Sequence, residues 1–445
     1  MRVGEDDENR GTASLHRVHA LLKDERLVRE FRSSETAFTR RRKLPFARLV
    51  ALLMTGWKMS IPNRLNRLFR QLGSLGNRPS PAAFCRARRK IRPELFERLN
   101  QEMVDSLYED SAPIVDRWNG RLLWAVDGTV LNLPDTPETR ARYGVQTNQK
   151  DATGWVQGLA SVVYDVLNEV VIHAVLDRKR SEKSFVLQDH RDSFRQEAIV
   201  LYDRLYCDYA VMAFHCSRGE DFVIRGRTTQ TFRQVATFVQ SSAEDRIVEL
   251  NVTDKQRGWV KKLGLSRRIR IRLIKVVLPD GTVEVLLTSL RDGGKYPRAS
   301  FQKLYEKRWG IETYFNQLKN LLEVERFSAK SVIGIEQDFH ALIFLSTLTS
   351  VLLAEEDHEA RNRSRVKGLK YTYRLNRSVS YVAVIDHIVD LLLDFDRDIE
   401  EVAAEIRQCL RGTMLPVRPG RHPQRGAKKN ASQLRFQWYR KRIWA

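Results

Sequence analysis

The stretch LYEKRWGIETYFNQLKNLLEVERFSAKS, residues 304–331, carries the most specific pattern in this chain of 445 residues. Steps of three, four and seven residues separate Tyr305, Arg308, Glu312 and Lys319. At about 100° per residue, an α-helix would hold these side chains within a stripe about 60° wide, beside an apolar face. The spacing therefore predicts one helix that presents a phenol, two cations and a carboxylate together, as a metal and phosphate site requires.

An excess of positive charge runs through the chain. It has 77 Lys and Arg against 55 Asp and Glu, which gives a formal charge of +22. Such an excess is typical of proteins with a polyanionic partner, and nucleic acid is the commonest one. A ribosomal or merely basic protein is the alternative that charge alone leaves open.

Cysteine spacing and hydropathy argue against several other classes. The four cysteines form no CxxC pair and no paired Cys/His spacing, so neither a zinc module nor a disulfide framework is indicated. The amino terminus is polar, and the most apolar run, which starts at Ala341, is shorter than a membrane span. We therefore expect reduced cysteines, a buried helix from Ala341, no membrane partner and a cytoplasmic location.

Residues 1–112 have the pattern of a helical region. Leu, Phe and Ile recur at helical spacing with Arg and Lys between them, and breaks such as GSLGNRPSP separate the segments. Short basic helices of this kind suit a small DNA-binding module. An amphipathic helical bundle with a solvated basic face is the alternative.

At Arg121 the pattern changes to β-strands. The segment RLLWAVDGTVLNLP is apolar and carries Asp127 near its middle, and residues 155–177 predict a hairpin. A helix is expected next, followed by a short buried strand that ends at Asp203. Each Asp alone would more often be a turn residue or a helix cap. The two are therefore candidate site residues only because they occur together in this order of strands.

Together these features resemble the insertion-sequence DDE transposases of the IS-four family, whose signature is Y-x2-R-x3-E-x6-K. The resemblance covers roughly residues 38–425 and implies two Asp and one Glu on a ribonuclease-H-like fold. Asp127, Asp203 and Glu312 match the three acidic positions in order and in local context. Relatives more often have DRGF or DRGY where this chain has DRLY, with Leu205 in the turn after Asp203.

The architecture that the resemblance implies is α/β, with a ribonuclease-H-like catalytic core, a β-strand insertion and an N-terminal helical DNA-binding region. We expect the core in residues 113–227 and 293–395, the insertion in residues 228–292, and a C-terminal helix end with a basic tail in residues 396–445. Alternating arginines in RRIRIRL predict several guanidinium groups on one face of the insertion, where a phosphate backbone could lie. The tail, with its interleaved aromatic residues, is predicted to be a disordered arm that binds nucleic acid.

The implied activity is cleavage and joining of phosphodiester bonds at the ends of an insertion sequence, by cut-and-paste transposition. Asp127, Asp203 and Glu312 would be the catalytic residues and the ligands of two Mg²⁺ ions, for which Mn²⁺ can substitute. The residues expected to contact DNA are Tyr305, Arg308 and Lys319.

The expected partners are double-stranded DNA, as terminal inverted repeats and as target, and a second copy of the chain in a homodimer on the DNA ends. Association with the nucleoid follows from that. Two alternatives stay open: a non-catalytic or regulatory DNA-binding protein derived from a transposase, and a ribonuclease-H-like nuclease without strand joining. A tyrosine recombinase is disfavoured, because His422, Arg425 and Tyr439 lie in a Pro- and Gly-rich tail that no rigid helix could align.

Overall fold

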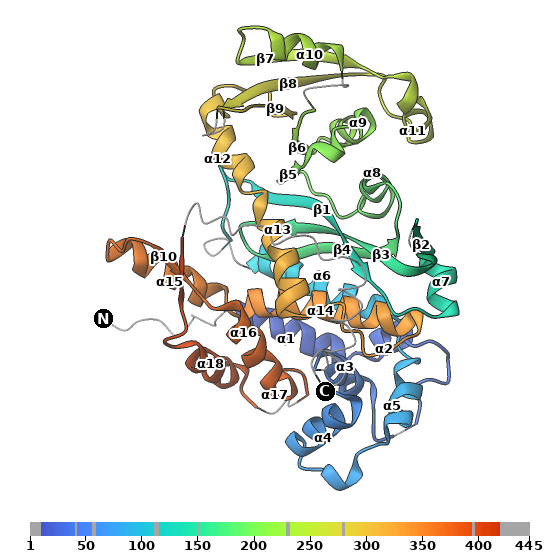
Figure 1. Ribbon diagram of the computed structural model, residues 1–445. Helices are drawn as coiled ribbons and strands as arrows, with labels where there is room; N and C mark the ends of the chain where they lie inside the picture. The colour runs from blue at the N-terminus through green and yellow to red at the C-terminus, as the bar shows by residue number, and fades with distance from the viewer. Residues whose placement is uncertain are drawn as a thin grey trace. The chain divides into compact units, whose positions relative to one another are not determined.

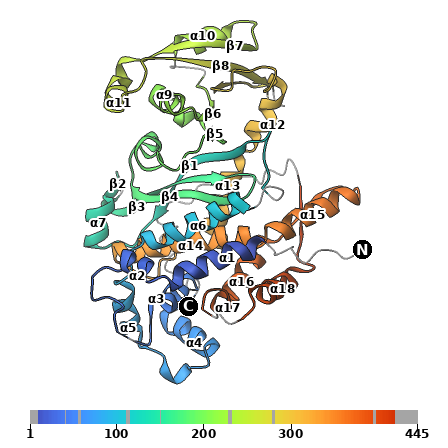
Figure 2. The same ribbon diagram turned by 180° about the vertical axis from the view of Figure 1, so that it is seen from behind.

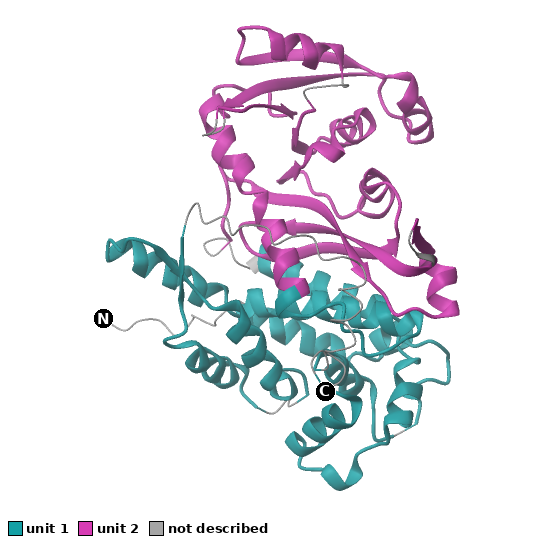
Figure 3. Cartoon of the chain, viewed as in Figure 1, with its two compact units in different colours: residues 1–114, 320–445 teal, residues 115–319 magenta. Residues whose placement is uncertain are grey.

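The chain forms two compact units in the computed structural model, which describes residues 10–40, 42–55, 59–110, 115–149, 151–227, 232–277, 281–393 and 397–418. Unit 1 comprises residues 1–114 and 320–445, and unit 2 comprises residues 115–319 (Figure 3). The predicted functional domains are drawn differently, because residues 320–395 were assigned to the catalytic core. The predicted domain bounds stay a prediction, because they separate segments by their expected function. The compact units separate segments by how closely they pack.

Unit 1 is helical apart from one small sheet (Figure 1). Its N-terminal elements are α1 (Arg10–Lys23), α2 (Glu25–Phe31), α3 (Phe46–Met54), α4 (Ile61–Gln71), η1 (Leu75–Asn77), α5 (Pro81–Arg88) and α6 (Glu94–Asp110). Its C-terminal elements are α14 (Val332–Leu352), α15 (Ala354–Val366), β10 (Thr372–Arg374), α16 (Arg377–Asp386), α17 (Ile388–Leu392), α18 (Ile399–Leu410) and β11 (Leu415–Val417). Residues 419–445, most of the predicted arm, lie outside the described part of the chain.

Helix α14 is the centre of unit 1. Almost its whole length is buried, and α1, α3 and α6 pack against it. A helix that is apolar all round is expected to be buried, and the buried helix predicted from Ala341 is confirmed as its second half. Among the described helices none is long and apolar enough alone to cross a membrane, and α14 and α15 match a span only when taken together across a 52° bend.

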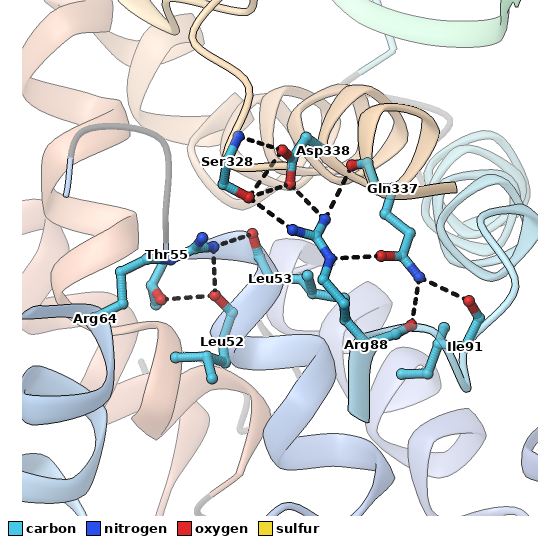
Figure 4. Close-up of polar contacts among 10 residues, drawn as sticks. Leu52, Leu53, Thr55, Arg64, Arg88, Ile91, Ser328, Gln337 and Asp338 are labelled. Atoms are coloured by element: carbon cyan, nitrogen blue, oxygen red, sulfur yellow. Dashed lines mark hydrogen bonds and ion pairs between the residues drawn. The ribbon is translucent and has the colours of Figure 1, made fainter. Parts of the chain in front are cut away.

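Two buried arginines hold the short helix α5 in unit 1 (Figure 4). Arg88 donates to Gln337 at 2.9 Å and to Asp338 at 2.8 Å, both on α14. Arg64 donates to two carbonyl groups in the last turn of α3 at 2.9 and 3.2 Å. The ring of Phe84 lies near both, 5.6 Å from the guanidinium carbon of Arg64 and 5.7 Å from that of Arg88. Helix α5 is thus fixed to α14 through Arg88 and to Arg64 of α4 through Phe84.

Unit 2 is built on one mixed sheet. The strands that form it are β1 (Leu122–Asn132), β2 (Val145–Asn148), β3 (Asp151–Asp165), β4 (Val170–Arg178), β5 (Ala198–Tyr202), β6 (Asp221–Arg225), β7 (Asp245–Asn251), β8 (Arg268–Val277) and β9 (Val283–Thr288). The helical elements are α7 (Pro137–Tyr143), α8 (Glu182–Ser184), η2 (Phe185–Asp189), η3 (Arg204–Tyr206), α9 (Tyr209–Arg218), α10 (Arg233–Gln240), η4 (Asp254–Gln256), α11 (Arg257–Lys262), η5 (Arg298–Ser300), α12 (Phe301–Glu306), α13 (Trp309–Asn316) and η6 (Gln317–Leu321).

The strand order is β2-β3-β1-β5-β6-β9-β8-β7, with β4 beside β3. Strands β1, β3 and β4 pair antiparallel, as the predicted hairpin requires, whereas β1, β5 and β6 pair in parallel. This arrangement is consistent with the predicted ribonuclease-H-like core. Strands β7, β8 and β9 lie in the predicted insertion and continue the same sheet from β6, with α10 along β7 and β8 (Figure 2).

The basic face predicted on the insertion is smaller than expected. Arg268 and Arg270 are exposed, but Arg272 is only 3% exposed. Its Nε donates to Asp245 at 2.8 Å and its Nη1 donates to the Tyr296 carbonyl oxygen at 2.8 Å. The prediction was wrong for Arg272 because β8 is an interior strand, so this guanidinium is neutralised by the neighbouring strand and leaves solvent.

The segment predicted as one regular helix is divided. Helix α12 ends at Glu306, α13 begins at Trp309, and η6 continues as a π-turn. Between α12 and α13 the N–H of Arg308 donates to the Tyr305 carbonyl at 3.0 Å, a tighter i to i−3 bond. Packing explains the change of pitch: a Cβ on Gly310 would lie 3.0 Å from the β3–β4 turn, so α13 lies close against the sheet.

Candidate active site

Two acidic residues lie side by side on the unit 2 sheet: Asp127 in the middle of β1, and Asp203 directly after the end of β5. Strands β1 and β5 pair in parallel up to Val126 and Tyr202, which are partners in the register. Asp127 and Asp203 come directly after them, so the two carboxylates are neighbours. Each accepts a hydrogen bond from a backbone N–H one or two residues further along, at 2.8 and 2.7 Å. In sheets with parallel strands this carboxyl edge is the usual place for a ligand site.

The turn after Asp203 keeps its carboxylate in place although it contains Leu205. The N–H of Leu205 donates to Asp203 Oδ1, and Asp203 thereby caps η3. The Leu205 side chain is 48% exposed and needs no space in the core. The departure from the DRGF and DRGY pattern therefore leaves the position of this carboxylate intact.

Arg308 is the counter-ion of the site. Its Nη2 lies 2.6 Å from Glu312 Oε1 and its Nη1 lies 3.6 Å from Asp127 Oδ2. The rings of Tyr305 and Trp309 lie 5.9 and 5.7 Å from the guanidinium carbon, and the residue is only 7% exposed. One partly desolvated cation thus attracts two of the three predicted carboxylates.

The ends of the signature segment bind the backbone of the same two strands. The Tyr305 hydroxyl donates to the carbonyl oxygen of Tyr202 at 3.1 Å, and Lys319 Nζ donates to that of Val130 at 2.7 Å. α13 packs against β1 between these points. All six residues predicted for the site, Asp127, Asp203, Glu312, Tyr305, Arg308 and Lys319, therefore lie along the second half of β1 and at the end of β5. Their catalytic and DNA-binding roles stay predictions.

The side chains fit a divalent cation in kind. Three carboxylates supply the hard oxygen ligands that Mg²⁺ prefers, and Arg308 already occupies the position of a shared positive charge between Asp127 and Glu312. Within the part of the chain that the structure describes, no three His, Cys, Asp or Glu side chains stand close enough to hold a metal ion. A metal ion shared by all three would require these side chains to move closer together.

Desolvation makes Asp127 hard to ionise. Burial raises the pKa of Asp127 to about 7; the Gly128 N–H and Arg308 oppose this shift, whereas the charges of Asp203 and Glu182 add to it. Perturbed carboxylates of this kind are found at functional sites more often than elsewhere. Asp127 therefore holds its proton up to near neutral pH, and a further cation beside it would favour its ionised form.

Sequence reasoning missed Glu182, the first residue of α8. Burial raises the pKa of Glu182; Tyr206 opposes the shift and Asp203 adds to it, so the side chain faces the same carboxylates. The topology carried a signal for it. Because β4 runs parallel to β1, the helix after β4 begins at the edge where Asp127 and Asp203 lie.

Comparison with known proteins decides the family. Residues 118–348, more than half of the chain, match the family model described as Transposase DDE domain. The chain belongs to the DDE transposase family. Transposase InsG for insertion sequence element IS4, from Escherichia coli strain K12, is 24% identical over 316 residues, which cover 70% of each chain. The resemblance to the IS-four family is thereby confirmed.

Among solved structures, this DDE transposase is similar to a piggyBac transposase in a synaptic complex with hairpin DNA, determined by cryo-EM. The TM-score is 0.43 and the identity 11%, and the match covers 95% of this chain and 88% of the other. A likeness this loose supports no functional assignment.

The raised pKa of Asp127 predicts a pH-dependent stability of the transposase. This pKa is about 7 in the folded chain and about 3.9 in an unfolded one, so the folded state holds the proton to higher pH. The contribution of this group to stability is therefore full below about pH 4 and is lost as pH rises to about 7. We expect the Tm of the wild type, relative to that of Asp127→Asn, to fall across this window in buffer with EDTA. A difference that stays constant with pH would contradict the assignment.

Proposed function

We propose that this transposase cleaves and joins phosphodiester bonds at the ends of an insertion sequence, by two-metal-ion catalysis and cut-and-paste transposition. The observation that carries the proposal is the parallel register of β1 and β5, which makes Asp127 and Asp203 neighbours. Glu312 joins them through Arg308, which contacts both Glu312 and Asp127. Transposition at DNA ends needs such an arrangement of carboxylates at one place.

Asp127, Asp203 and Glu312 would hold two Mg²⁺ ions, which Mn²⁺ can replace. When bound, the ions supply an activated water or 3′-hydroxyl and neutralise the leaving oxygen of the phosphodiester. No nucleophile from the protein is then required. Support comes from Arg308, because carboxylates that share one cation have the charge and the orientation to share another.

Arg308, Tyr305 and Lys319 would contact the DNA backbone beside the cleaved bond. A phosphate offers Arg308 the same kind of paired oxygens as Glu312, so DNA could replace one carboxylate at little cost in hydrogen bonds. Such an exchange would leave Glu312 available to a metal ion at the moment when the substrate is present. Arginine suits this role because its charge does not depend on pH near neutrality.

The N-terminal helical region would bind the DNA ends. Residues 36–93 contain 15 Lys and Arg and no Asp or Glu, and cations of this density favour a phosphate backbone. Eight of them are exposed in the described part of the chain: Arg40, Arg42, Lys43, Arg70, Arg78, Arg86, Arg89 and Arg92. A solvated basic face alone would not require the whole segment to lack acidic residues.

Within this region α5 is the element best suited to enter a groove. Its inner face is fixed by Arg88 and Phe84, whereas Ala82, Cys85 and Arg86 are exposed on the other side. Small residues flanked by arginine allow close approach to base edges and phosphates. A rigidly held helix of this kind can present the same side chains to every DNA end.

We further propose that a homodimer holds two terminal inverted repeats and the target DNA, and that the protein is associated with the nucleoid in the cytoplasm. Two other functions are compatible with the fold: a regulatory DNA-binding protein without catalysis, and a nuclease without strand joining. Cleavage of a terminal duplex would separate the transposase from the first, and joining of the cut end to a second duplex would separate it from the other.

The carboxylate assignment predicts the behaviour of three variants. Asp127→Asn, Asp203→Asn and Glu312→Gln remove a charge with little change in size, so they should fold and still bind terminal DNA. Cleavage with Mg²⁺ should fall by at least about a hundredfold in each, because in-line displacement needs both ions. Glu306→Gln, at an exposed position of α12, is the control and should cut normally. Near-normal cleavage by any of the three folded variants would refute the assignment.

The α5 assignment predicts protection of one thiol. Cys85 and Cys409 are both exposed, so a maleimide should label both in the free protein. A duplex that carries the terminal sequence of the element, read from the DNA beside the gene, should slow the labelling of Cys85 by at least about tenfold, since a groove-bound helix excludes the reagent. Cys409 is the internal control. Mass spectrometry that shows equal labelling of Cys85 with and without DNA would exclude α5 as the contact.

A further inference from the structure

Glu182 lies against the backbone of the residue that follows Asp127. A Cβ built on Gly128 would stand 3.1 Å from Glu182 Cδ and 3.3 Å from its Oε2. Those distances are tighter than ordinary contacts, so glycine at position 128 lets the Glu182 carboxyl group lie there without a shift of a few tenths of an ångström. The close approach places a further acidic group beside the first predicted metal ligand.

The carboxyl group of Glu182 has an oxygen without a partner. Its Oε2 is buried and accepts no hydrogen bond from any described residue. The two basic residues nearest in sequence are engaged elsewhere, because Lys183 pairs with Asp208 at 2.9 Å and Arg180 pairs with Asp189. A buried carboxylate oxygen that lacks both a donor and a counter-charge costs free energy, and a bound cation would remove that cost.

A second orphaned group points to the same place. Tyr206 is 0% exposed, and its hydroxyl makes no hydrogen bond of good geometry among the described residues, although it lies near enough to Glu182 to oppose the rise in the pKa of that carboxyl group. It belongs to η3, which follows Asp203 and packs against α8. Burial and the charges of Glu182 and Asp127 raise the pKa of Tyr206 well above its usual value, so its hydroxyl remains a donor at neutral pH. A buried phenol beside a carboxylate can orient that carboxylate.

We propose that Glu182 binds a divalent cation together with Asp127 and Asp203, as a fourth acidic ligand of the site, with Tyr206 orienting its carboxyl group. Binding would draw these side chains closer together than they stand in the described structure. The proposal rests on the proposed function, which supplies the cation. Gly128 leaves space for the Glu182 carboxyl group, and the start of α8 places Glu182 beside Asp127. Arg308 contacts Asp127 and Glu312, and no bond from it to Glu182 is formed. Among the described residues Glu182, like Asp203, therefore forms no ion pair with a basic side chain.

The test is Mn²⁺ binding to the purified full-length chain without DNA, measured from the electron paramagnetic resonance signal of free Mn²⁺. Glu182→Gln should weaken binding by about tenfold or more, as loss of a ligand or of its support typically does. Glu306→Gln removes the same charge at an exposed position and should bind as the wild type does. Equal affinities of these two variants would overturn the proposal.

Asp127→Asn separates this proposal from the proposed function. If it binds Mn²⁺ as tightly as the wild type, the metal site itself is wrong. If it loses binding while Glu182→Gln retains it, only the role of Glu182 is wrong.

Gly128→Ala gives an independent route, because its methyl group would push the Glu182 carboxyl group away by a few tenths of an ångström while it keeps the Asp127 side chain. It should weaken Mn²⁺ binding about as much as Glu182→Gln, and the double variant should lose no more than either single one. Should Glu182→Gln fail to fold, normal Mn²⁺ affinity of Gly128→Ala would itself overturn the proposal.

Discussion

Several carboxylates at one edge of a sheet repel one another, and this repulsion is the constraint on which the architecture of unit 2 depends. The register of β1 and β5 brings Asp127 and Asp203 together, and burial together with the charge of Asp203 raises the pKa of Asp127 to about 7. Arg308 reduces this repulsion, because its guanidinium group pairs with Glu312 and lies beside Asp127. The signature segment is therefore both a source of one acidic residue and the electrostatic support of another.

That double role explains why the signature segment is not a regular helix. Tyr305 must reach the end of β5 and Lys319 must reach β1, while Arg308 faces the carboxylates between them. An undistorted helix would have to meet three fixed points of a twisted sheet at once. The tighter bond at Arg308 and the π-turn after α13 adjust the pitch to those points, as local departures from α-helical geometry at functional sites often do.

The strands that carry Asp127 and Asp203 could be predicted from sequence, because apolar β-rich runs mark them locally, and the resemblance to the family implied that the two carboxylates belong together. The interior of the sheet could not. The alternating pattern of β8 predicts that Arg272 is exposed. Only the pairing of β7 with β8 shows that Asp245 lies within hydrogen-bond distance of its guanidinium group. Arg88 bonds Gln337 and Asp338, which lie 249 and 250 residues away in the sequence, and no local pattern predicts such a contact. Glu182 was missed for a related reason, since its partners come from two other strands.

Iron-directed cleavage of the purified chain would test whether separate segments converge on one cation. Fe²⁺ bound in place of Mg²⁺, with ascorbate and peroxide, releases hydroxyl radicals that cut the backbone beside the ion. We expect cuts at three places far apart in sequence, next to Asp127, Asp203 and Glu312, and their loss when excess Mg²⁺ competes. Cuts elsewhere, or cuts that Mg²⁺ does not suppress, would contradict a metal site built from these three carboxylates.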